Sequence, residues 1–544
     1  MANLGFQAVY HLLNGIDACV CERAFLPDDE ECLEFERSET PLFSLESQRP
    51  LKEFDIVAFS IAFEDDYQNV LRILRLAGIP AESSARKTLK PIVLAGGVAP
   101  SLNPEPLARF VDIFSIGEAE GFLRPIIDMA GGLANEGAPR PELIKRFDEI
   151  PWIYVPALYD YEFDGTGIRQ VSINTGAKKK VLAAKNSVTN LERHEIPRSF
   201  VKTPEALFAG ATLFEVERGC TRLCRFCAAG FLYLPPRWRG IDKIKDSFNM
   251  LNKGDDSTGV ANRVGIVGAA VSEHPHIREV LECAIGLNAE ATLSSLRLDM
   301  LDEGFLTLLK KAGYSTITVA PEAGSERMRG VINKNISEAE ILHAARLIKD
   351  AGFNKIKMYF LVGLPEEEDL DAEAIASLST DIKGILKKCE ITLSINPFIP
   401  KPLTPFQWSA FERVDVIEKR ISIIKKALLR QKGFKLTIAS PRTSFAQAYV
   451  SRADRRAGAF ISDIEAEGLA KAVKKNRPFM EGSAYRPRQK DEILPWDLID
   501  HGVKKGFLWN EHQKSLGASP TAACDVGRCF KCGVCVPEKR GYNH

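Results

Sequence analysis

Three cysteines crowd into one short stretch of the chain, at Cys220, Cys224 and Cys227. Three thiols are an odd number for a set of disulfides and one ligand fewer than a closed tetrahedral zinc site uses. A 4Fe–4S cluster presents four irons, so three thiolates would anchor three of them and leave the fourth with an open coordination position. The spacing therefore predicts a loop that wraps one corner of a 4Fe–4S cluster. The alternative is three unrelated buried cysteines.

Four more cysteines lie close together near the end of the chain, separated by four, two and two residues: Cys524, Cys529, Cys532 and Cys535. Gaps of four and two residues occur in iron–sulfur proteins. Gaps of two also occur in zinc sites, often with a glycine in the turn, such as Gly533 here. The sequence thus predicts either a second cluster, which could supply electrons to the first or bind substrate, or a structural zinc ion. The other cysteines are expected to be buried packing residues: Cys19, Cys21, Cys32, Cys283 and Cys389.

Composition bounds the class of protein. The 544 residues exceed one ordinary core, so we expect about two to four domains of roughly 150 residues each. Lys plus Arg and Asp plus Glu are equal at 72 each, so the overall charge does not indicate a nucleic-acid partner. No apolar run reaches the ~18 residues that span a membrane, and the N-terminus shows no export signal. Clustered cysteines in such a chain favour metal ligation and predict a cytoplasmic protein.

The first 150 residues alternate strand and helix signals. Continuous apolar runs over residues 55–60, 91–97 and 112–116 are typical of buried parallel strands. The repeat of strand, loop and helix predicts a doubly wound, Rossmann-like α/β domain over residues 1–150. Ligands of such sheets bind beyond the carboxyl ends of the strands. These ends carry the candidate binding residues Ser60, Gly96, Gly97, Gly117 and Glu118, with Glu120 nearby.

The rest of the chain divides into three predicted regions. Residues 151–205 are expected to form a linker with a small sheet. Residues 206–440 resume the alternation in six strand–helix units, which predicts a (β/α)6 partial TIM barrel with its chemistry on the loops that follow the strands. Residues 441–544 are expected to form a small C-terminal α+β region that ends in the four-cysteine tail.

The three-cysteine loop resembles the signature of radical S-adenosylmethionine enzymes, and the similarity covers about residues 205–410. The resemblance implies that the amino and carboxylate groups of S-adenosylmethionine chelate the fourth iron. It further implies that one electron from the cluster cleaves the C5′–S bond, giving methionine and a 5′-deoxyadenosyl radical that removes a hydrogen atom from a target. The protein holds and shields the cofactors, which carry the chemistry.

The same resemblance implies contacts to S-adenosylmethionine at the ends of the strands. Phe226 would pack beside the ligand of the open iron, and the small residues Gly268 and Ala269 would offer backbone groups to its ammonium. Arg297 could pair with its carboxylate by two hydrogen bonds, or it could belong to a structural ion pair. Glu322 could accept hydrogen bonds from the ribose or the ammonium, the alternative being a plain exposed carboxylate.

The segment "LVGLPEE" resembles the strand end that contacts adenine in the same enzymes. Leu361 would lie against the base and Gly363 would give room for it. The alternative for Leu361 is an ordinary core residue.

The N-terminal region resembles the cobalamin-binding-type domain that precedes many radical enzymes of this superfamily. No D-x-H-x-x-G string occurs in the chain, so no histidine is predicted to ligate cobalt from below. The strand and loop that usually begin such a domain are absent before Met1, so we expect an incomplete domain or a start placed too far downstream. Both cobalamin binding and a degenerate domain kept for its contacts remain open. The layout as a whole resembles a bacterial family of uncharacterised radical enzymes with such a domain.

These patterns predict an oxygen-sensitive enzyme that generates a 5′-deoxyadenosyl radical. If cobalamin binds, methyl transfer to an unactivated carbon is the expected reaction. The alternatives are sulfur insertion into tRNA, as in methylthiotransferases, and a non-catalytic iron–sulfur electron carrier or redox sensor. The expected partners are a substrate, which the sequence does not identify, and an electron donor such as flavodoxin or ferredoxin. The sequence nominates no hydrogen donor or general base.

Overall fold

The computed structural model describes residues 3–133, 136–183, 187–201, 210–250 and 263–535. The chain forms two compact units. The barrel unit comprises Met1–Gln7, Thr189–Phe445 and Val503–His544, and the sheet unit comprises Ala8–Val188 and Ala446–Gly502. The residues predicted as one C-terminal region are thus divided between the two units. None of the described helices combines the length and the apolar character that crossing a bilayer demands.

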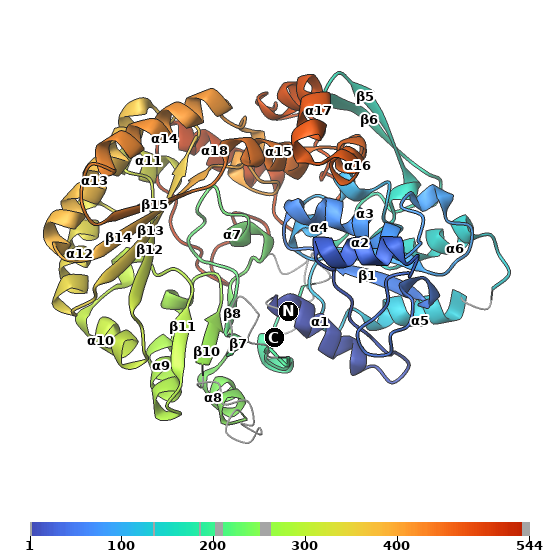
Figure 1. The fold of residues 1–544 in the computed structure, drawn as a ribbon, viewed down its shortest axis with the longest axis horizontal. Coiled ribbons are helices and arrows are strands. Elements are labelled where there is room, and N and C mark those ends of the chain that lie inside the picture. Colours follow the sequence, from blue (N-terminus) through green and yellow to red (C-terminus); the bar gives the residue numbers. More distant parts are fainter. Residues whose placement is uncertain (1–2, 134–135, 184–186, 202–209, 251–262, 536–544) are drawn as a thin grey trace. The chain divides into compact units, whose positions relative to one another are not determined.

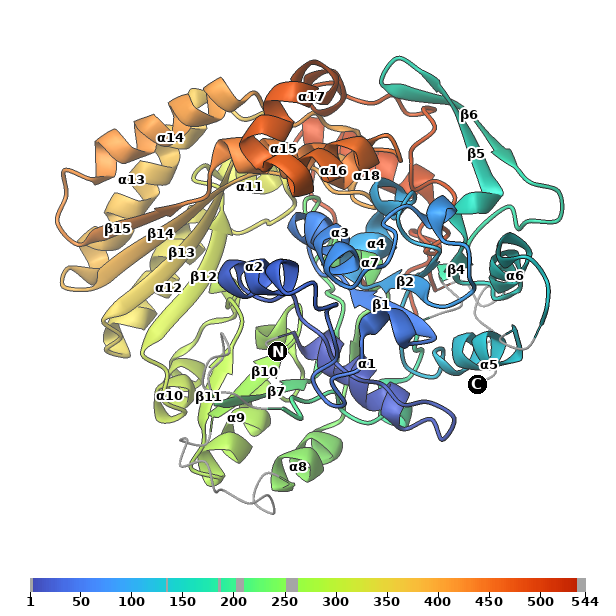
Figure 2. The same ribbon diagram turned by 45° about the vertical axis from the view of Figure 1, so that its right-hand side comes forward.

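The sheet unit is built on a four-stranded sheet of order β1-β2-β3-β4 (Figures 1 and 2). Strands β1 (Ile56–Ser60), β2 (Ile92–Gly96) and β3 (Ile113–Ser115) are parallel, and β4 (Ile153–Tyr154) is antiparallel to β3. The parallel sheet confirms the α/β prediction. The order does not reverse among the described strands, so the predicted doubly wound arrangement, which needs such a reversal, is not seen there. Apolar runs indicate buried strands, but they do not specify which strands become neighbours.

Helices and one hairpin complete the sheet unit. The amphipathic α3 packs against α16, and Arg75 forms an ion pair with Glu465 at 2.7 Å. The hairpin β5 (Tyr159–Asp164) and β6 (Gly167–Ile173) is the small sheet predicted after residue 150. The helices of residues 4–146 and 441–484 are α1 (Leu4–Asn14), α2 (Asp29–Arg37), α3 (Tyr67–Leu76), α4 (Val98–Leu102), α5 (Arg124–Leu133), α6 (Arg140–Arg146), α15 (Pro441–Arg452), α16 (Ala457–Glu467) and α17 (Leu469–Ala484).

The motif "SRADRR" ties the C-terminal part of the sheet unit to its sheet. The side-chain amide of Asn103 donates hydrogen bonds to the carbonyls of Ser451 and Ala453, at 3.1 and 2.8 Å. Arg455 pairs with the buried Glu105 at 2.8 Å, and its guanidinium lies 4.3 Å from the ring centroid of Tyr161. Buried polar groups therefore hold together segments that are about 350 residues apart in sequence.

In the described residues of the barrel unit, seven parallel strands form two sheets. The order β11-β10-β7 is made by β7 (Ala211–Glu215), β10 (Arg263–Val267) and β11 (Glu290–Leu293). The second sheet is β12 (Thr316–Glu322), β13 (Lys355–Val362), β14 (Glu390–Pro397) and β15 (Phe434–Ile438), in that order. A parallel bridge between Leu296 and Val319 joins the two. The partial barrel is confirmed, and β15 adds a strand that the six-unit prediction did not count.

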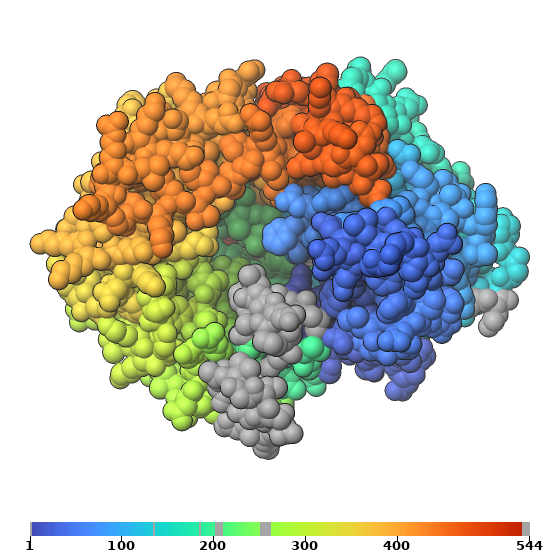
Figure 3. Space-filling model, viewed as in Figure 1, coloured from blue at the N-terminus to red at the C-terminus, as the bar shows by residue number. Residues whose placement is uncertain are grey.

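Helices cover the outer side of these strands (Figure 1). In the space-filling view of Figure 3 the side chains of α13 and α14 form a continuous orange layer over this part of the barrel. The helix α12 begins at the predicted capping box of Ser337 and Glu340. The helices are α7 (Ala229–Leu232), α8 (Ile241–Asn249), α9 (Ile277–Gly286), α10 (Glu303–Lys311), α11 (Glu326–Val331), α12 (Glu338–Asp350), α13 (Asp369–Leu386), α14 (Val414–Leu428) and α18 (Lys505–Leu516).

Helix α18 anchors the C-terminal segment within the barrel unit. It packs on the short 3-10 helix Pro405–Trp408, where the rings of Trp408 and Trp509 meet edge to face at 5.1 Å between centroids. The short antiparallel pair β8 (Glu217–Arg218) and β9 (Arg237–Trp238) brackets the three-cysteine loop.

Replacing Arg455 tests the polar core of the sheet unit. Arg455→Ala would leave the carboxylate of Glu105, whose side chain is 1% exposed, without its cation. Because a buried charge that loses its partner is costly, we expect the free energy of unfolding to fall by about 3 kcal/mol. Urea unfolding measures it. Arg442→Ala is the control, since Arg442 is 83% exposed and its removal should change stability by less than about 0.5 kcal/mol. Equal effects of the two changes would contradict this account.

Candidate functional site

The loop with the three cysteines follows β7 and β8 and leads into α7. Backbone turns close it, from the N–H of Cys227 to the carbonyl of Cys224 at 3.0 Å and from Gly230 to Cys227 at 3.2 Å. Gly219 opens the loop in a left-handed conformation (φ 87°), and a Cβ there would lie 2.5 Å from the carbonyl oxygen of Tyr233. Only glycine fits this close approach.

The structure brings the three predicted thiols together; Cys224 is buried, and Cys220 and Cys227 are partly buried. Burial is the main cause that raises the pKa of each thiol, that of Cys220 to about 12. Cys224 and Cys227 add to the rise at Cys220, because nearby thiolates repel one another. Among the described residues, no three His, Cys, Asp or Glu side chains are grouped to hold a single metal ion. The loop therefore gathers three thiols in one part of the barrel unit, with Cys224 the most buried of them.

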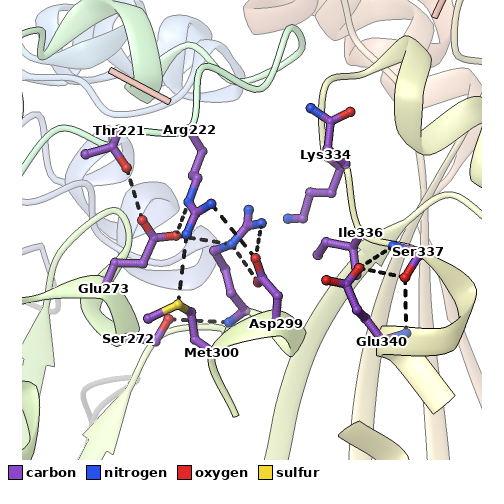
Figure 4. A network of polar contacts seen from close by, with 12 residues as sticks. Thr221, Arg222, Ser272, Glu273, Asp299, Met300, Lys334, Ile336, Ser337 and Glu340 are labelled. Carbon is purple, nitrogen blue, oxygen red and sulfur yellow. Dashed lines mark hydrogen bonds and ion pairs between the residues drawn. The ribbon is translucent and has the colours of Figure 1, made fainter. Parts of the chain in front are cut away.

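A polar network fixes this loop to the ends of β10 and β11 (Figure 4). Glu273, after β10, accepts hydrogen bonds from the hydroxyl of Thr221 at 3.1 Å and from Nε of Arg222 at 2.8 Å. Glu273 also pairs with Arg297 at 3.1 Å, and Arg297 pairs with Asp299, after β11, at 2.9 Å. The two residues that follow Cys220 are thus held by a carboxylate from the neighbouring strand end. The sequence could not predict these hydrogen bonds, because Glu273 lies about 50 residues after the loop residues that it contacts.

Arg297 forms the structural ion pair that was the alternative for this residue. Its guanidinium is occupied by Asp299 and Glu273, and its side chain is 10% exposed. Its positive charge lowers the pKa of the Cys224 thiol, against the larger effect of burial, which raises it. Its contact with a ligand carboxylate stays a prediction.

Lys334 is a site residue that the sequence reasoning missed. It lies between Asn333 and Asn335, both in the left-handed region with φ 55° and 47°, and its side chain points toward the network of Figure 4. Its charge lowers the pKa values of Cys224 and Cys227 against the larger effect of burial. The sequence offers one sign of this residue, a lysine between two asparagines that favour turns. Only the fold shows that the lysine side chain approaches the three-cysteine loop, which lies more than 100 residues earlier in the chain.

Glu322 lies at the end of β12, as predicted, and is not a plain exposed carboxylate. Its side chain is 12% exposed and its backbone is left-handed (φ 68°), where the pairing of β12 with β13 shifts register. Burial raises its pKa, and the ammonium of Lys334, 3.5 Å from Oε1, opposes the rise. Glu322 and Lys334 therefore form a buried pair of opposite charges beside the thiols.

Gly268 and Ala269 lie just beyond β10, next to a second missed residue, Glu217. A Cβ on Gly268 would lie 2.2 Å from Cγ of Glu217, so the glycine is required by this carboxylate. Oε1 of Glu217 accepts a hydrogen bond from the N–H of Ala270. Burial raises the pKa of Glu217 to about 7, and the charge of Glu273 adds to the rise. The contact of Gly268 and Ala269 with a ligand ammonium stays a prediction.

Phe226 and Leu361 meet on one apolar cluster. Both are partly buried against Met328, Phe398 and neighbouring residues of the barrel unit. Leu361 thus shares the core character that was its alternative, while part of it remains open to solvent or ligand. Gly363 has φ 88°, and a Cβ there would lie 3.1 Å from that of Glu412, so glycine is needed for the turn itself.

In the sheet unit, the predicted cobalamin-site residues lie at the carboxyl ends of the parallel strands. Ser60 and Gly96 are paired neighbours at the ends of β1 and β2. Gly97 has φ 105°, and a Cβ there would lie 2.4 Å from the carbonyl oxygen of Ile61. The N–H of Gly117 donates to the hydroxyl of Ser101 at 3.3 Å, and Glu118 accepts from the N–H of Val188 at 2.6 Å. The fold itself therefore accounts for several of these residues without a ligand, and cobalamin binding stays a prediction.

Comparison with known proteins identifies the family. The sequence pattern of the N-terminal region of radical SAM proteins matches residues 5–156, and that of the radical SAM superfamily matches residues 214–379. A protein of Methanocaldococcus jannaschii, uncharacterized protein MJ0966, is 30% identical over 437 residues, which cover 80% of this chain and 86% of that protein. The chain belongs to the radical SAM superfamily. It is therefore an enzyme, and a 4Fe–4S cluster and S-adenosylmethionine are the cofactors that this family implies.

More distant similarities were also found. The putative methylthiotransferase MJ0865 of the same organism is 24% identical over 191 residues, which cover 33% of this chain and 41% of that protein. The structure of the radical S-adenosylmethionine methyltransferase TsrM from Kitasatospora setae, with cobalamin and a 4Fe–4S cluster bound, has a TM-score of 0.49 and 11% identity, over 88% of this chain and 95% of that one. The cobalamin-dependent radical enzyme OxsB has a TM-score of 0.43 and 12% identity, over 85% and 70%. Likeness at this level does not extend to function.

The three-cysteine loop fits the cluster that the family implies. Thiolates suit iron–sulfur clusters, and three of them on one loop would bind three different irons rather than one ion. Buried thiolates are costly alone, and the positive irons, with Lys334 nearby, would offset that cost. Cys220, Cys224 and Cys227 are thus the residues that would hold the cluster.

Glu217 predicts a pH dependence of stability. Because its pKa is higher in the folded protein than the ordinary 4.5, the protonated carboxyl stabilises the fold fully below about pH 4.5 and this contribution is lost as the pH rises through about 7. Glu217→Gln stays neutral, so at pH 8 it should be more stable than the wild type by up to about 3 kcal/mol, with little difference near pH 4.5. Anoxic urea unfolding at both pH values measures this difference. The control Glu290→Gln alters a half-exposed carboxylate and should show no such dependence; a pH-independent difference for Glu217→Gln would refute the interpretation.

Proposed function

We propose that this enzyme cleaves S-adenosylmethionine reductively at the loop of Cys220, Cys224 and Cys227 and uses the radical so formed on a substrate. One observation carries the proposal: three thiols, one buried and two partly buried, lie together on the loop after β7. Beside them is a largely buried pair of opposite charges from the end of β12 and the turn after α11. When bound, the cluster supplies the electron that cleaves the sulfonium to methionine and a 5′-deoxyadenosyl radical. Three protein thiolates leave one iron open for that ligand.

We assign the polar end of S-adenosylmethionine to Glu322 and Lys334. The ligand carries an ammonium and a carboxylate on one carbon atom, and the two side chains offer the opposite charges 3.5 Å apart. Both side chains are about one-tenth exposed, so their charges act with little screening by water. Phe226 and Leu361, on their shared apolar cluster, would flank the less polar part of the ligand.

The protein contributes orientation and the exclusion of water. Glu273 accepts hydrogen bonds from Thr221 and Arg222 and so fixes the start of the loop. Only 9% of Cys224 is exposed, so little water reaches its thiol. A reactive carbon radical needs such shielding, because solvent and wrong partners would quench it. A one-electron donor of the flavodoxin or ferredoxin class would supply the electron.

For the finer reaction we favour methyl transfer that depends on cobalamin. The support is the placement of Ser60, Gly96 and Gly97 at the carboxyl ends of parallel strands, where α/β sheets bind their ligands. Added hydroxocobalamin should then remain with the protein through gel filtration and give a bound visible spectrum. Sulfur insertion is the alternative, and the name of the relative MJ0865 favours it. A protein that retains no cobalamin would leave the sulfur chemistry as the better candidate.

Loss of one thiol should abolish the chemistry. The enzyme is purified without oxygen, reconstituted with iron and sulfide, and incubated with dithionite and S-adenosylmethionine. We expect 5′-deoxyadenosine from the wild type and at least about 100-fold less from Cys224→Ala, because the cluster loses one of its three anchors. The control Cys283→Ala removes a half-buried cysteine on α9 and should keep full activity. Product formation in Cys224→Ala would overturn the proposal.

Lys334→Met tests the assignment of the ligand's carboxylate. We expect S-adenosylmethionine to bind about 10- to 100-fold more weakly, because a charged hydrogen bond contributes about 1.5–3 kcal/mol. The change in the EPR spectrum of the reduced cluster on titration with the ligand measures this affinity. Lys349→Met, at an exposed position of α12, is the control and should bind normally. Unchanged affinity in Lys334→Met, with the cluster intact, would exclude this role.

A further inference from the structure

The four cysteines of the tail lie close together in the structure. The N–H of Cys529 donates to the carbonyl of Asp525 at 3.0 Å, and that of Gly533 to Phe530 at 3.2 Å, so two consecutive turns fold the segment back on itself. Gly527 and Gly533 have φ 84° and 90°, the left-handed values that such turns need. Cys532 is 7% exposed. These turns keep the four cysteines within one short folded segment.

The tail is attached directly to the three-cysteine loop. The N–H of Cys524 donates to the carbonyl of Thr221, the residue after Cys220, at 2.7 Å. Asn333 holds both segments. Its side-chain oxygen accepts from the N–H of Thr521 at 2.9 Å, and its amide donates to the carbonyls of Arg222 and Leu223 at 3.2 and 3.3 Å. The two cysteine groups are therefore neighbours, connected by hydrogen bonds at each one's border.

Arg225 strengthens this attachment from inside the loop. Its side chain, between two of the three cysteines in sequence, is fully buried. The guanidinium pairs with Glu511 of α18 at 3.2 Å and donates to the carbonyl of Ser519 at 2.6 Å. It also donates to the carbonyls of Gly330 and Val331, at 3.1 and 3.0 Å. A buried arginine with so many partners is costly to displace, so the path of the chain from α18 to Cys524 is fixed relative to the loop.

We infer that Cys524, Cys529, Cys532 and Cys535 bind a second iron–sulfur cluster, seated beside the first. Their gaps match two iron–sulfur patterns at once: C-x4-C-x2-C in the first three and C-x2-C-x2-C in the last three. Structural zinc sites instead take pairs of ligands from two separated segments and converge on one point. The tail supplies all its thiols from one segment.

The number of ligands indicates the role of the second site. Four protein thiolates can satisfy all four irons, so none is left open for a substrate or for S-adenosylmethionine. A closed cluster beside the three-cysteine loop is suited to electron transfer. The existence of this second site does not depend on the proposed function, although its usefulness does.

Iron content decides between one site and two. After anoxic reconstitution of the full chain we expect about eight irons and eight sulfides per chain, four for each cluster. The double variant Cys529→Ser/Cys532→Ser should retain about four, and the triple variant Cys220→Ser/Cys224→Ser/Cys227→Ser should retain the other four. Cys283→Ala is the matched control and should retain all. About four irons in the wild type, unchanged in the tail variant, would overturn the inference, as would one zinc per chain in the protein as isolated without oxygen.

Spectroscopy tests that the two sites are neighbours. In the reduced wild type, the EPR signals of two adjacent paramagnetic clusters should broaden one another, and this measurement needs no variant. The double and the triple Cys→Ser variants should each show a single unbroadened signal. Two clusters with uncoupled spectra would contradict the placement. A wild type with about eight irons that makes no 5′-deoxyadenosine would refute the proposed function and leave the second site standing. The converse result, with about four irons and active enzyme, would do the opposite.

Discussion

The candidate site of the barrel unit brings three sulfur atoms close together, largely out of contact with water. Thiolates repel one another, and burial removes the water that would otherwise stabilise them, which is why burial dominates the pKa of every cysteine in the loop. Such a loop keeps its shape only if other groups hold its backbone. Glu273 holds its first residues, Asn333 its middle, and Arg225 connects it to α18. These three side chains therefore hold the backbone of the loop at its beginning, its middle and its contact with α18.

The charged residues around the thiols divide into two sets with different tasks. Arg222, Arg297, Glu273 and Asp299 satisfy one another, and their mutual pairs leave little charge for a ligand. Glu322 and Lys334 form a single pair at 3.5 Å, longer than the contacts of Glu273 with Arg222 and Arg297 and of Arg297 with Asp299, and both influence the thiols. A loosely matched buried pair is the better candidate for ligand binding, because a zwitterion can replace each partner with little loss.

The described residues after position 445 belong partly to the sheet unit and partly to the barrel unit. Asn103 and Glu105 bind the segment around Arg455 within the sheet unit. Glu511 and Trp509 lie on α18 and attach this helix to the barrel unit through their contacts with Arg225 and Trp408. This division explains why a motif such as "SRADRR" is rich in arginine: its side chains serve buried carboxylates and carbonyls. A sequence pattern of this kind indicates importance, but it does not indicate partners that lie hundreds of residues away.

The sequence by itself indicated which side chains could hold a cofactor, namely the clustered cysteine thiols, and the class of fold. The spacing of Cys220, Cys224 and Cys227 specifies a short loop with three thiols, and alternating apolar runs specify parallel strands, because both are local properties of the chain. Tertiary structure alone decided the rest. The order of strands in the sheet unit, the engagement of Arg297 in ion pairs, the charge of Lys334 at the thiols and the attachment of Cys524 to Thr221 all join distant residues. Such contacts depend on how elements pack, and periodicity within one element carries no information about them.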